Sequence, residues 1–195
     1  MISLSLMTGF LITAVFLRII IQYQRTGDSG IRAASTRAPV IEILPGVIFI
    51  LTFCFALALV VLGYLELISV LHNLPMVVQY VGFLLGVTGI AIVVISQFQM
   101  GNSWRIGVDQ KESTSLITHG LYANSRNPIY FGLLLFWIGL SVTFPHPLLW
   151  LSATMCWICI ELIVRKIEEP YLIKEHGDAF QQYAFRTNRY LPLNL

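Results

Sequence analysis

Residues whose side chains can do chemistry concentrate in two stretches of the C-terminal half. The first stretch, 101–130, mixes glycine, aromatic and basic residues and is about thirty residues long. The second stretch, 165–172, carries Arg165 and the pair Glu168-Glu169. A connection this long inside a compact protein is usually either functional or disordered. Its content of Trp, Tyr, Leu and Ile argues against disorder, so we expect a binding site there.

Helix ends and buried acids give this region its most specific features. Pro128 suits the first turn of a helix with Asn127 as its N-cap. The free backbone N–H groups of such a turn bind a carboxylate or another anion, although a simple cap is an equal alternative.

Glu161 falls inside a predicted membrane span, where an acid is costly and usually functional. Its alternative is an ion pair with Arg165, one helical turn away. The pair Glu168-Glu169, at the end of the same predicted span, is also a functional candidate. The alternative is that both carboxylates are simply solvated at the level of the lipid headgroups.

Several other chemistries are excluded by what the sequence lacks. Cys156 and Cys159 have a C-x-x-C spacing, but both lie inside an apolar run without a nearby histidine, so we interpret them as buried small hydrophobes. The four histidines are scattered, and no metal site is expected. There is no nucleophile elbow, Walker loop or Rossmann fingerprint. A net charge of only +2 gives no indication of nucleic-acid binding.

Long apolar runs must position these residues. The chain is 56% apolar and 11% charged, whereas a soluble domain carries about 25% charged residues. A membrane-spanning helix needs about 20 apolar residues. The sequence therefore predicts an all-α integral membrane protein with about five transmembrane helices. The predicted helices cover Ile2–Ile21, Ile43–Leu65, Leu74–Gln97, Ile129–Phe144 and Leu148–Val164.

Prolines and charges set the predicted topology. Pro145 and Pro147 break the apolar stretch 127–160 into a hairpin of two short helices, which we do not require to span fully. If the helices alternate, all twelve basic residues fall on one side, which the positive-inside rule places in the cytoplasm. Arg18, near the end of the first helix, is expected to extend to the interface.

Gly82 and Gly86 indicate close helix packing. The tail from Tyr171 to Tyr183 is typical of an interfacial amphipathic helix that covers the cytoplasmic loops.

The two polar stretches together resemble isoprenylcysteine carboxyl methyltransferases, and we identify the chain as similar to a short prokaryotic member. Gly120-Leu121-Tyr122 followed by Arg126-Asn127-Pro128-Ile129-Tyr130-Phe131-Gly132 resembles the Gly-x-Tyr…Arg-His-Pro-x-Tyr-x-Gly signature of that family. The tail from Glu168-Glu169 through Gly177 and Tyr183 to Arg189 and Pro192 resembles its Glu-Glu…Gly…Tyr…Arg-x-x-Pro ending. Asn127 stands where the family usually has His; an amide can still form hydrogen bonds but cannot act as a base near neutral pH.

The resemblance implies a division of the chain and a cofactor. Residues 1–99 would form three N-terminal membrane helices, and residues 100–195 the methyltransferase region with a cytoplasmic C-terminal cofactor-binding part. The methyl donor would be S-adenosyl-L-methionine, leaving S-adenosyl-L-homocysteine as product. The cofactor contacts that the resemblance carries over are Leu116, Ile117, His119, Gly120, Leu121, Tyr122, Asn127, Pro128, Ile129, Tyr130 and Glu168.

The resemblance also implies a substrate and a location. The acceptor would be the C-terminal carboxylate of a prenylated cysteine or prenylated protein, whose lipid chain enters from the bilayer. A carboxylate is already ionised at neutral pH, so no general base is needed. Arg126, Arg105 and Arg165 are the candidate cations that hold it. The site would face the cytoplasm, in the cell membrane.

Three other functions stay open on the sequence. A methyltransferase acting on a phospholipid amine would need a base such as His119 or a glutamate. A sterol-type reductase would need a tight basic cluster for the 2′-phosphate of NADPH. A non-catalytic membrane scaffold would leave the thirty-residue connection and the paired glutamates unexplained.

Overall fold

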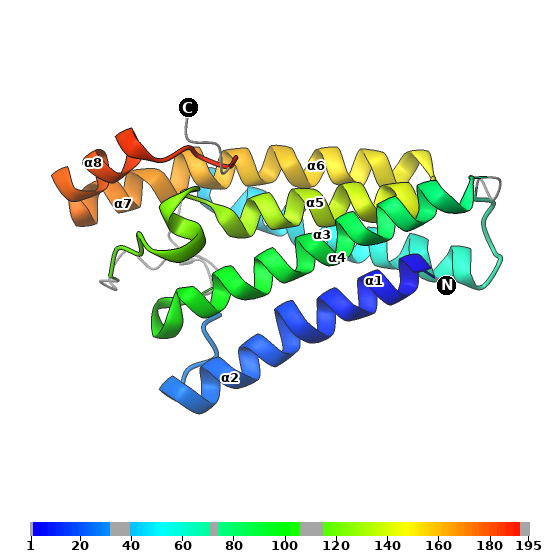
Figure 1. Ribbon diagram of the computed structural model, residues 1–195, viewed down its shortest axis with the longest axis horizontal. Coiled ribbons are helices and arrows are strands. Elements are labelled where there is room, and N and C mark those ends of the chain that lie inside the picture. Colours follow the sequence, from blue (N-terminus) through cyan, green and yellow to red (C-terminus); the bar gives the residue numbers. More distant parts are fainter. Residues whose placement is uncertain (1, 32–39, 71–73, 106–114, 192–195) are drawn as a thin grey trace.

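The computed structural model describes residues 2–31, 40–70, 74–105 and 115–191, and these form a bundle of long helices with a helical tail at one end (Figure 1). The helices are α1 (Ile2–Phe10), α2 (Leu17–Thr26), α3 (Val40–Tyr64), α4 (Met76–Gln99), α5 (Pro128–Thr143), α6 (Pro147–Ile163), α7 (Glu169–His176) and α8 (Asp178–Arg186). Short 3₁₀ turns cover Gly101–Ser103 and Gly120–Ala123. The described residues contain no β-strand, so the predicted all-α class is confirmed.

The described residues contain five apolar helices, and four of these are long enough to cross a membrane by themselves. These four cover Ile2–Thr26, Ile43–Tyr64, Met76–Gln99 and Pro147–His176. The fifth, α5, has 16 residues, which is about 24 Å at 1.5 Å per residue and shorter than the hydrocarbon core of about 30 Å. Successive membrane helices run in opposite directions, so the C-terminal ends of α2 and α4 lie at the same end of the bundle as the tail (Figure 1). Of the basic residues used for topology, Arg32, Arg37 and Lys111 lie outside the described residues.

Helix α5 packs closely on α4 because small residues line both surfaces. A Cβ on Gly139 would lie 2.4 Å from the backbone nitrogen of Gly86 and 2.5 Å from the carbonyl oxygen of Gly82. Only glycine permits such backbone contact. The predicted role of Gly82 and Gly86 is therefore confirmed. A second contact holds the first turns of α5, which carry motif residues, against α4, because a Cβ on Gly132 would lie 2.8 Å from the carbonyl oxygen of Gly89.

The first helix differs from the prediction at its C-terminal end. It continues to Thr26 through a π-helical segment, Leu11–Phe16. Arg18 does not extend to the interface, because its side chain turns inward and is only 1% exposed. It donates from Nη2 to the carbonyl of Gly101 at 2.7 Å. The prediction of an interfacial Arg18 is therefore wrong.

The last long helix does not end at Val164 as predicted. A π-helical segment, Val164–Glu168, joins α6 to α7 without a break. Pro170 lacks a backbone N–H and disfavours a regular helix interior, and the wide π turn directly before it accommodates this defect. Glu168 and Glu169 therefore lie within a continuous helix. Gly177, with φ of 52°, then separates α7 from α8, so the tail is two short helices.

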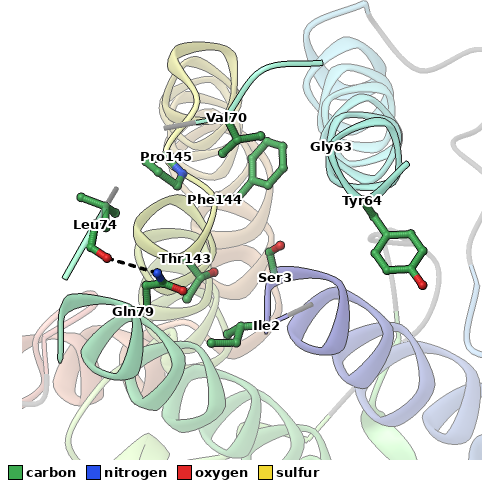
Figure 2. Close-up of a pocket in the computed structure, with 10 residues that line it drawn as sticks. All are labelled: Ile2, Ser3, Gly63, Tyr64, Val70, Leu74, Gln79, Thr143, Phe144 and Pro145. Carbon is green, nitrogen blue, oxygen red and sulfur yellow. Dashed lines mark hydrogen bonds between the residues drawn. The ribbon is translucent and has the colours of Figure 1, made fainter. Parts of the chain in front are cut away.

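A cavity of about 150 Å³ lies at the opposite end of the bundle from the tail. Figure 2 shows its lining, which comes from the beginnings of α1 and α4, the end of α3 and the α5–α6 turn. Inside it, the Gln79 amide donates to the carbonyl of Leu74 at 3.3 Å. Its lining has no acid, base or thiol besides the phenol of Tyr64, so the chemistry predicted for the C-terminal half belongs elsewhere.

Candidate functional site

The segment before α5 is joined to the tail by backbone hydrogen bonds. The N–H of Arg126 donates to the carbonyl of Asn188 at 2.8 Å, and the N–H of Asn127 donates to the carbonyl of Arg189 at 3.1 Å. Ser125 and Asn188 form an isolated parallel bridge. The two motifs that the sequence suggested, about sixty residues apart, therefore lie side by side at one end of the bundle (Figure 1).

Asn127 occupies the N-cap position of α5 as predicted, with Pro128 in the first turn. Its side chain does not cap the helix, however. The amide Nδ2 instead donates to the carbonyl of Arg189 at 3.1 Å. No side chain caps α5, so the N–H groups at the start of this helix stay without a side-chain acceptor.

Glu169 is held by two arginines from different segments. Its Oε2 accepts from Arg189 Nη2 at 2.7 Å, and its Oε1 accepts from Arg189 Nε at 2.9 Å and from Arg126 Nη2 at 3.3 Å. The three side chains are between 14% and 26% exposed. These hydrogen bonds also raise the pKa of Arg189. Arg126 further donates from Nη1 to the carbonyls of Ala184 and Thr187. The network ties α7, the end of α8 and the motif together.

The neighbouring Glu168 has a different environment. The hydroxyl of Tyr130 donates to its Oε1 at 2.6 Å. Among the residues that the structure describes, no arginine, lysine or histidine forms an ion pair with Glu168. Tyr122 lies close by: burial raises the pKa of Tyr122 well above its ordinary value, and the negative charge of Glu168 raises it further. The sequence-predicted residues Tyr122, Tyr130 and Glu168 are thus brought together around one carboxylate.

The 3₁₀ turn that carries Tyr122 is fixed from two sides. The amide oxygen of Gln99 accepts from the N–H of Leu121 at 2.8 Å. Gly120 has φ of 62°, and a Cβ there would lie 2.4 Å from the Gln99 amide, so glycine is required. On the other side, the hydroxyl of Tyr183 donates to the carbonyl of Tyr122 at 2.7 Å. Burial raises the pKa of Tyr183 to about 12, which keeps this phenol a hydrogen-bond donor at neutral pH.

The remaining predicted site residues lie around this centre. Leu116, Ile117 and Leu121 are half-buried, whereas His119 is exposed. Ile129 is half-buried and packs against the hydrophobic core.

The three candidate arginines have different surroundings. Arg165 pairs with Glu161 on the same helix and is 55% exposed, which confirms the alternative given for Glu161. Arg126 belongs to the network around Glu169. The guanidinium carbon of Arg105 lies 5.4 Å from the ring centroid of Tyr171, one helical turn beyond Glu168. Arg105 is therefore the candidate that lies beside the helix that carries Glu168.

Sequence reasoning missed two residues that build this region. Gln99 is the last residue of α4, and no prediction was made for it. Arg18 was expected at the membrane interface. Neither has a local pattern that indicates its partner, because the contacts cross 22 and 83 residues of sequence.

The tail also departs from the prediction in detail. The amphipathic stripe does pack inward at Tyr171 and Phe180, which are 8% and 3% exposed. Ala179, which the helical spacing of the tail predicts on the same apolar stripe, is exposed instead, because the break at Gly177 rotates α8 relative to α7. Pro192, the last residue of the ending motif, lies outside the described residues.

The arrangement suits a ligand with both positive and negative groups. A partly buried carboxylate without a cationic partner favours a cation. Aromatic rings such as those of Tyr122 and Tyr130 also attract cations through their faces. The uncapped N-terminus of α5 favours an anion. Tyr122 and Tyr183 stay protonated at neutral pH because burial raises their pKa, so neither phenol is available there as a base.

Comparisons with known proteins agree with the predicted resemblance. Probable protein-S-isoprenylcysteine O-methyltransferases of Oryza sativa subsp. indica and subsp. japonica are each 29% identical over 119 residues. That alignment covers 59% of this chain and 61% of the relatives' length. A solved structure of a eukaryotic intramembrane Ras methyltransferase, isoprenylcysteine carboxyl methyltransferase, matches with a TM-score of 0.62 at 19% identity, covering 100% of this chain and 68% of the other. The similarity of fold to a membrane enzyme is thereby confirmed.

A family model described as phospholipid methyltransferase matches residues 77–179. The matched region begins in α4, includes the motif before α5 and both glutamates, and ends at the start of α8. It covers slightly more than half of the 195 residues. The chain belongs to the phospholipid methyltransferase family.

Proposed function

We propose that this chain is an S-adenosylmethionine-dependent carboxyl O-methyltransferase that esterifies the C-terminal carboxylate of a prenylated cysteine. Family membership and the names of the matched relatives support a methyltransferase. The observation that carries the proposal is the carboxylate of Glu168. It is bonded to Tyr130, lies close to Tyr122 and has no cationic partner among the described residues.

The residues present fit the methyl donor. S-adenosylmethionine carries an ammonium and a sulfonium, which suit Glu168 and the faces of the two tyrosines. Its carboxylate suits the N–H groups at the start of α5, which no side chain caps. Leu116, Ile117 and Leu121 supply half-buried apolar surface for the adenine. His119, Gly120, Asn127, Pro128 and Ile129 complete the predicted cofactor-binding set.

The chemistry that a bound donor would supply is a methyl group on positively charged sulfur, which would pass in line to an oxygen of the acceptor carboxylate with the neutral thioether, S-adenosyl-L-homocysteine, as the leaving group. The work of the protein is alignment and removal of water from the reacting charges. Tyr183 and the Glu169 network hold the tail over the motif, and this arrangement limits access of water to Glu168.

We assign the role of holding the acceptor carboxylate to Arg105. Its guanidinium stacks on Tyr171, one helical turn from Glu168. Arg126 is better described as a positioning residue, since its guanidinium already bonds Glu169 and two backbone carbonyls. Arg165 pairs with Glu161 and stays a second candidate on the exposed side.

The proposal includes a membrane location with the site on the cytoplasmic face of the cell membrane. Four helices long and apolar enough to span support a membrane protein. The described basic residues concentrate at the end of the bundle that carries the site, which the positive-inside rule assigns to the cytoplasm. The prenyl chain of the substrate would then lie in the bilayer.

A second candidate is methylation of a phospholipid amine, because the matching family model carries that description. An ammonium acceptor must first lose a proton and needs a base. His119 is exposed, and Glu168 is bonded to Tyr130. These placements favour the carboxylate acceptor. A reductase that uses NADPH is not favoured, since Arg126 and Arg189 both pair with Glu169.

The test is an acceptor assay with the methyl group of the donor labelled. Purified protein in lipid nanodiscs is given farnesylcysteine or phosphatidylethanolamine. We expect label on farnesylcysteine that base releases, as from a methyl ester, and a rate that persists below the pKa of an amine. Base-stable label found on the phospholipid alone would replace the first proposal by the second.

A further inference from the structure

Arg18 is a buried cation without a counter-charge among the described residues. Its side chain is 1% exposed, and Nε and Nη1 have no hydrogen-bond partner. Its one hydrogen bond runs from Nη2 to the carbonyl of Gly101. A buried charge is costly unless other interactions offset the loss of water, so this arginine must contribute something that an apolar residue would not.

Aromatic contact is what Arg18 gains. Its guanidinium carbon lies 4.5 Å from the ring centroid of Trp104 and 5.8 Å from that of Phe98. Trp104 is itself only 3% exposed. Gly30, in the turn after α2, also lies against the indole, where a Cβ would be 3.0 Å from the ring. Arg18 and Gly30 thus form a socket for Trp104.

The first helix forms hydrogen bonds at one-turn intervals with the last turn of α4 and with the segment that follows it. The carbonyl of Ala14 accepts from the Gln97 amide at 3.0 Å, Arg18 donates to Gly101, and the Gln22 amide donates to the carbonyl of Asn102 at 3.1 Å. Ala14 lies in the π-helical segment, and such segments often occur at functional sites. Three contacts from one face fix both the position and the direction of 97–104.

Arg105 directly follows Trp104 in the sequence, and its guanidinium lies over the ring of Tyr171 in α7. Rotation or displacement of Trp104 would therefore be passed directly to Arg105. We propose that Arg18 is a positioning residue, which sets Arg105 relative to the Glu168 centre and makes the first helix part of the catalytic unit. This inference rests on the proposed function, in which Arg105 holds the acceptor carboxylate.

The experiment compares Arg18→Gln and Arg18→Lys with wild-type protein in nanodiscs. The matched control is Arg25→Gln, which removes an exposed arginine two turns along the same helix. We expect Arg18→Gln to raise KM for farnesylcysteine and to lower kcat/KM by about 10- to 100-fold, the effect of misplacing a binding group by about 1 Å. The Kd for S-adenosylmethionine should stay within about twofold of wild type, since no contact of Arg18 reaches Glu168. Lysine keeps the charge but lacks the planar stacking group, so it should restore activity only in part.

Two further measurements separate positioning from simple destabilisation. A double-mutant cycle combines Arg18→Gln with Arg105→Gln. In the Arg105→Gln background, Arg18→Gln should cause little further loss of kcat/KM, because both changes act through the same guanidinium. Acrylamide quenching of Trp104 emission, isolated by difference from the Trp104→Phe counterpart, should rise in Arg18→Gln and not in Arg25→Gln. Additive losses in the cycle, or an unchanged quenching of Trp104, would overturn the inference. If wild-type protein does not methylate farnesylcysteine, the proposed function fails, and the quenching result still decides whether Arg18 holds the segment.

Discussion

Glu168 and Glu169 are adjacent in sequence but have different partners. Glu169 accepts three hydrogen bonds from two arginines, whereas Glu168 accepts one from Tyr130. The first arrangement satisfies a carboxylate within the protein, and the second leaves one available for a ligand cation. The two residues should therefore respond differently to the same substitution.

We predict that Glu168→Gln weakens binding of S-adenosylmethionine by about 10- to 100-fold, the value of a charge-assisted hydrogen bond of about 1.5–3 kcal/mol. Its thermal stability should be close to that of wild type. Calorimetry with the donor measures the first quantity and a melting curve the second. Wild-type affinity in Glu168→Gln would remove this residue from the site.

Glu169→Gln should show the opposite pattern. Removing one partner from a partly buried ion-pair network costs about 3 kcal/mol, and the tail is what the network holds. Limited proteolysis should cleave within α8 faster than in wild type, while Glu175→Gln, an exposed acid on α7, should behave as wild type. An unchanged cleavage rate would contradict the tail-holding role of Glu169.

Sequence identified much of this centre, since Tyr122, Tyr130 and Glu168 all belong to the two motifs. It could not assign roles to the arginines. Arg126 could contact a substrate or Glu169, and Arg18 could face lipid or Trp104. The outcome for each arginine depends on which distant segment of the chain packs beside it. Charge and spacing along one helix do not contain that information.

At the scale of elements, apolar length predicted the helices well and their ends poorly. The hairpin at Pro145 and Pro147 is confirmed, with His146 as the N-cap of α6. The continuation through Pro170 was missed, because a proline normally indicates a helix boundary and the π turn before it cannot be read from composition. Close packing at Gly82 and Gly86 was indicated by their spacing, since close backbone approach demands residues without side chains, but the spacing did not identify α5 as the partner helix.

That contact makes a prediction about stability. Gly139→Ala should destabilise the protein by about 1–3 kcal/mol, the cost of overpacking a tight contact, because the new Cβ would meet the backbone of α4 at 2.4 Å. Gly46→Ala in α3 is the matched control. Nothing lies within 4 Å of its added Cβ, and alanine favours helix by about 1 kcal/mol. Thermal unfolding in detergent compares the two; equal melting temperatures would contradict the close α4–α5 contact.

At the scale of the whole molecule, the shortest apolar helix is the most enclosed. Helix α5 has 16 residues, and its buried positions include Leu133, Phe136, Trp137 and Leu140. Phe136 also stacks on Phe10 of the first helix at 4.5 Å between ring centroids. A helix surrounded by other helices need not match the full bilayer thickness with its own lipid-facing surface. The short length of α5 is therefore compatible with a membrane-spanning helix that is enclosed by the four longer helices.

Alternating crossings place the α3–α4 connection and the tail on opposite sides of the membrane. Leu67, 68% exposed, follows α3, whereas Glu175 is exposed on α7. We predict that Leu67→Cys reacts with a membrane-impermeant maleimide from the outside of intact cells, and that Glu175→Cys reacts only after the cells are opened. The exposed Cys54 is first replaced by serine, while the buried Cys156 and Cys159 should stay unlabelled and serve as the internal control. An even number of crossings between the two positions would label both from one side. That result would mean that only one of α5 and α6 crosses the membrane, so that the tail and the site lie on the same side as Leu67.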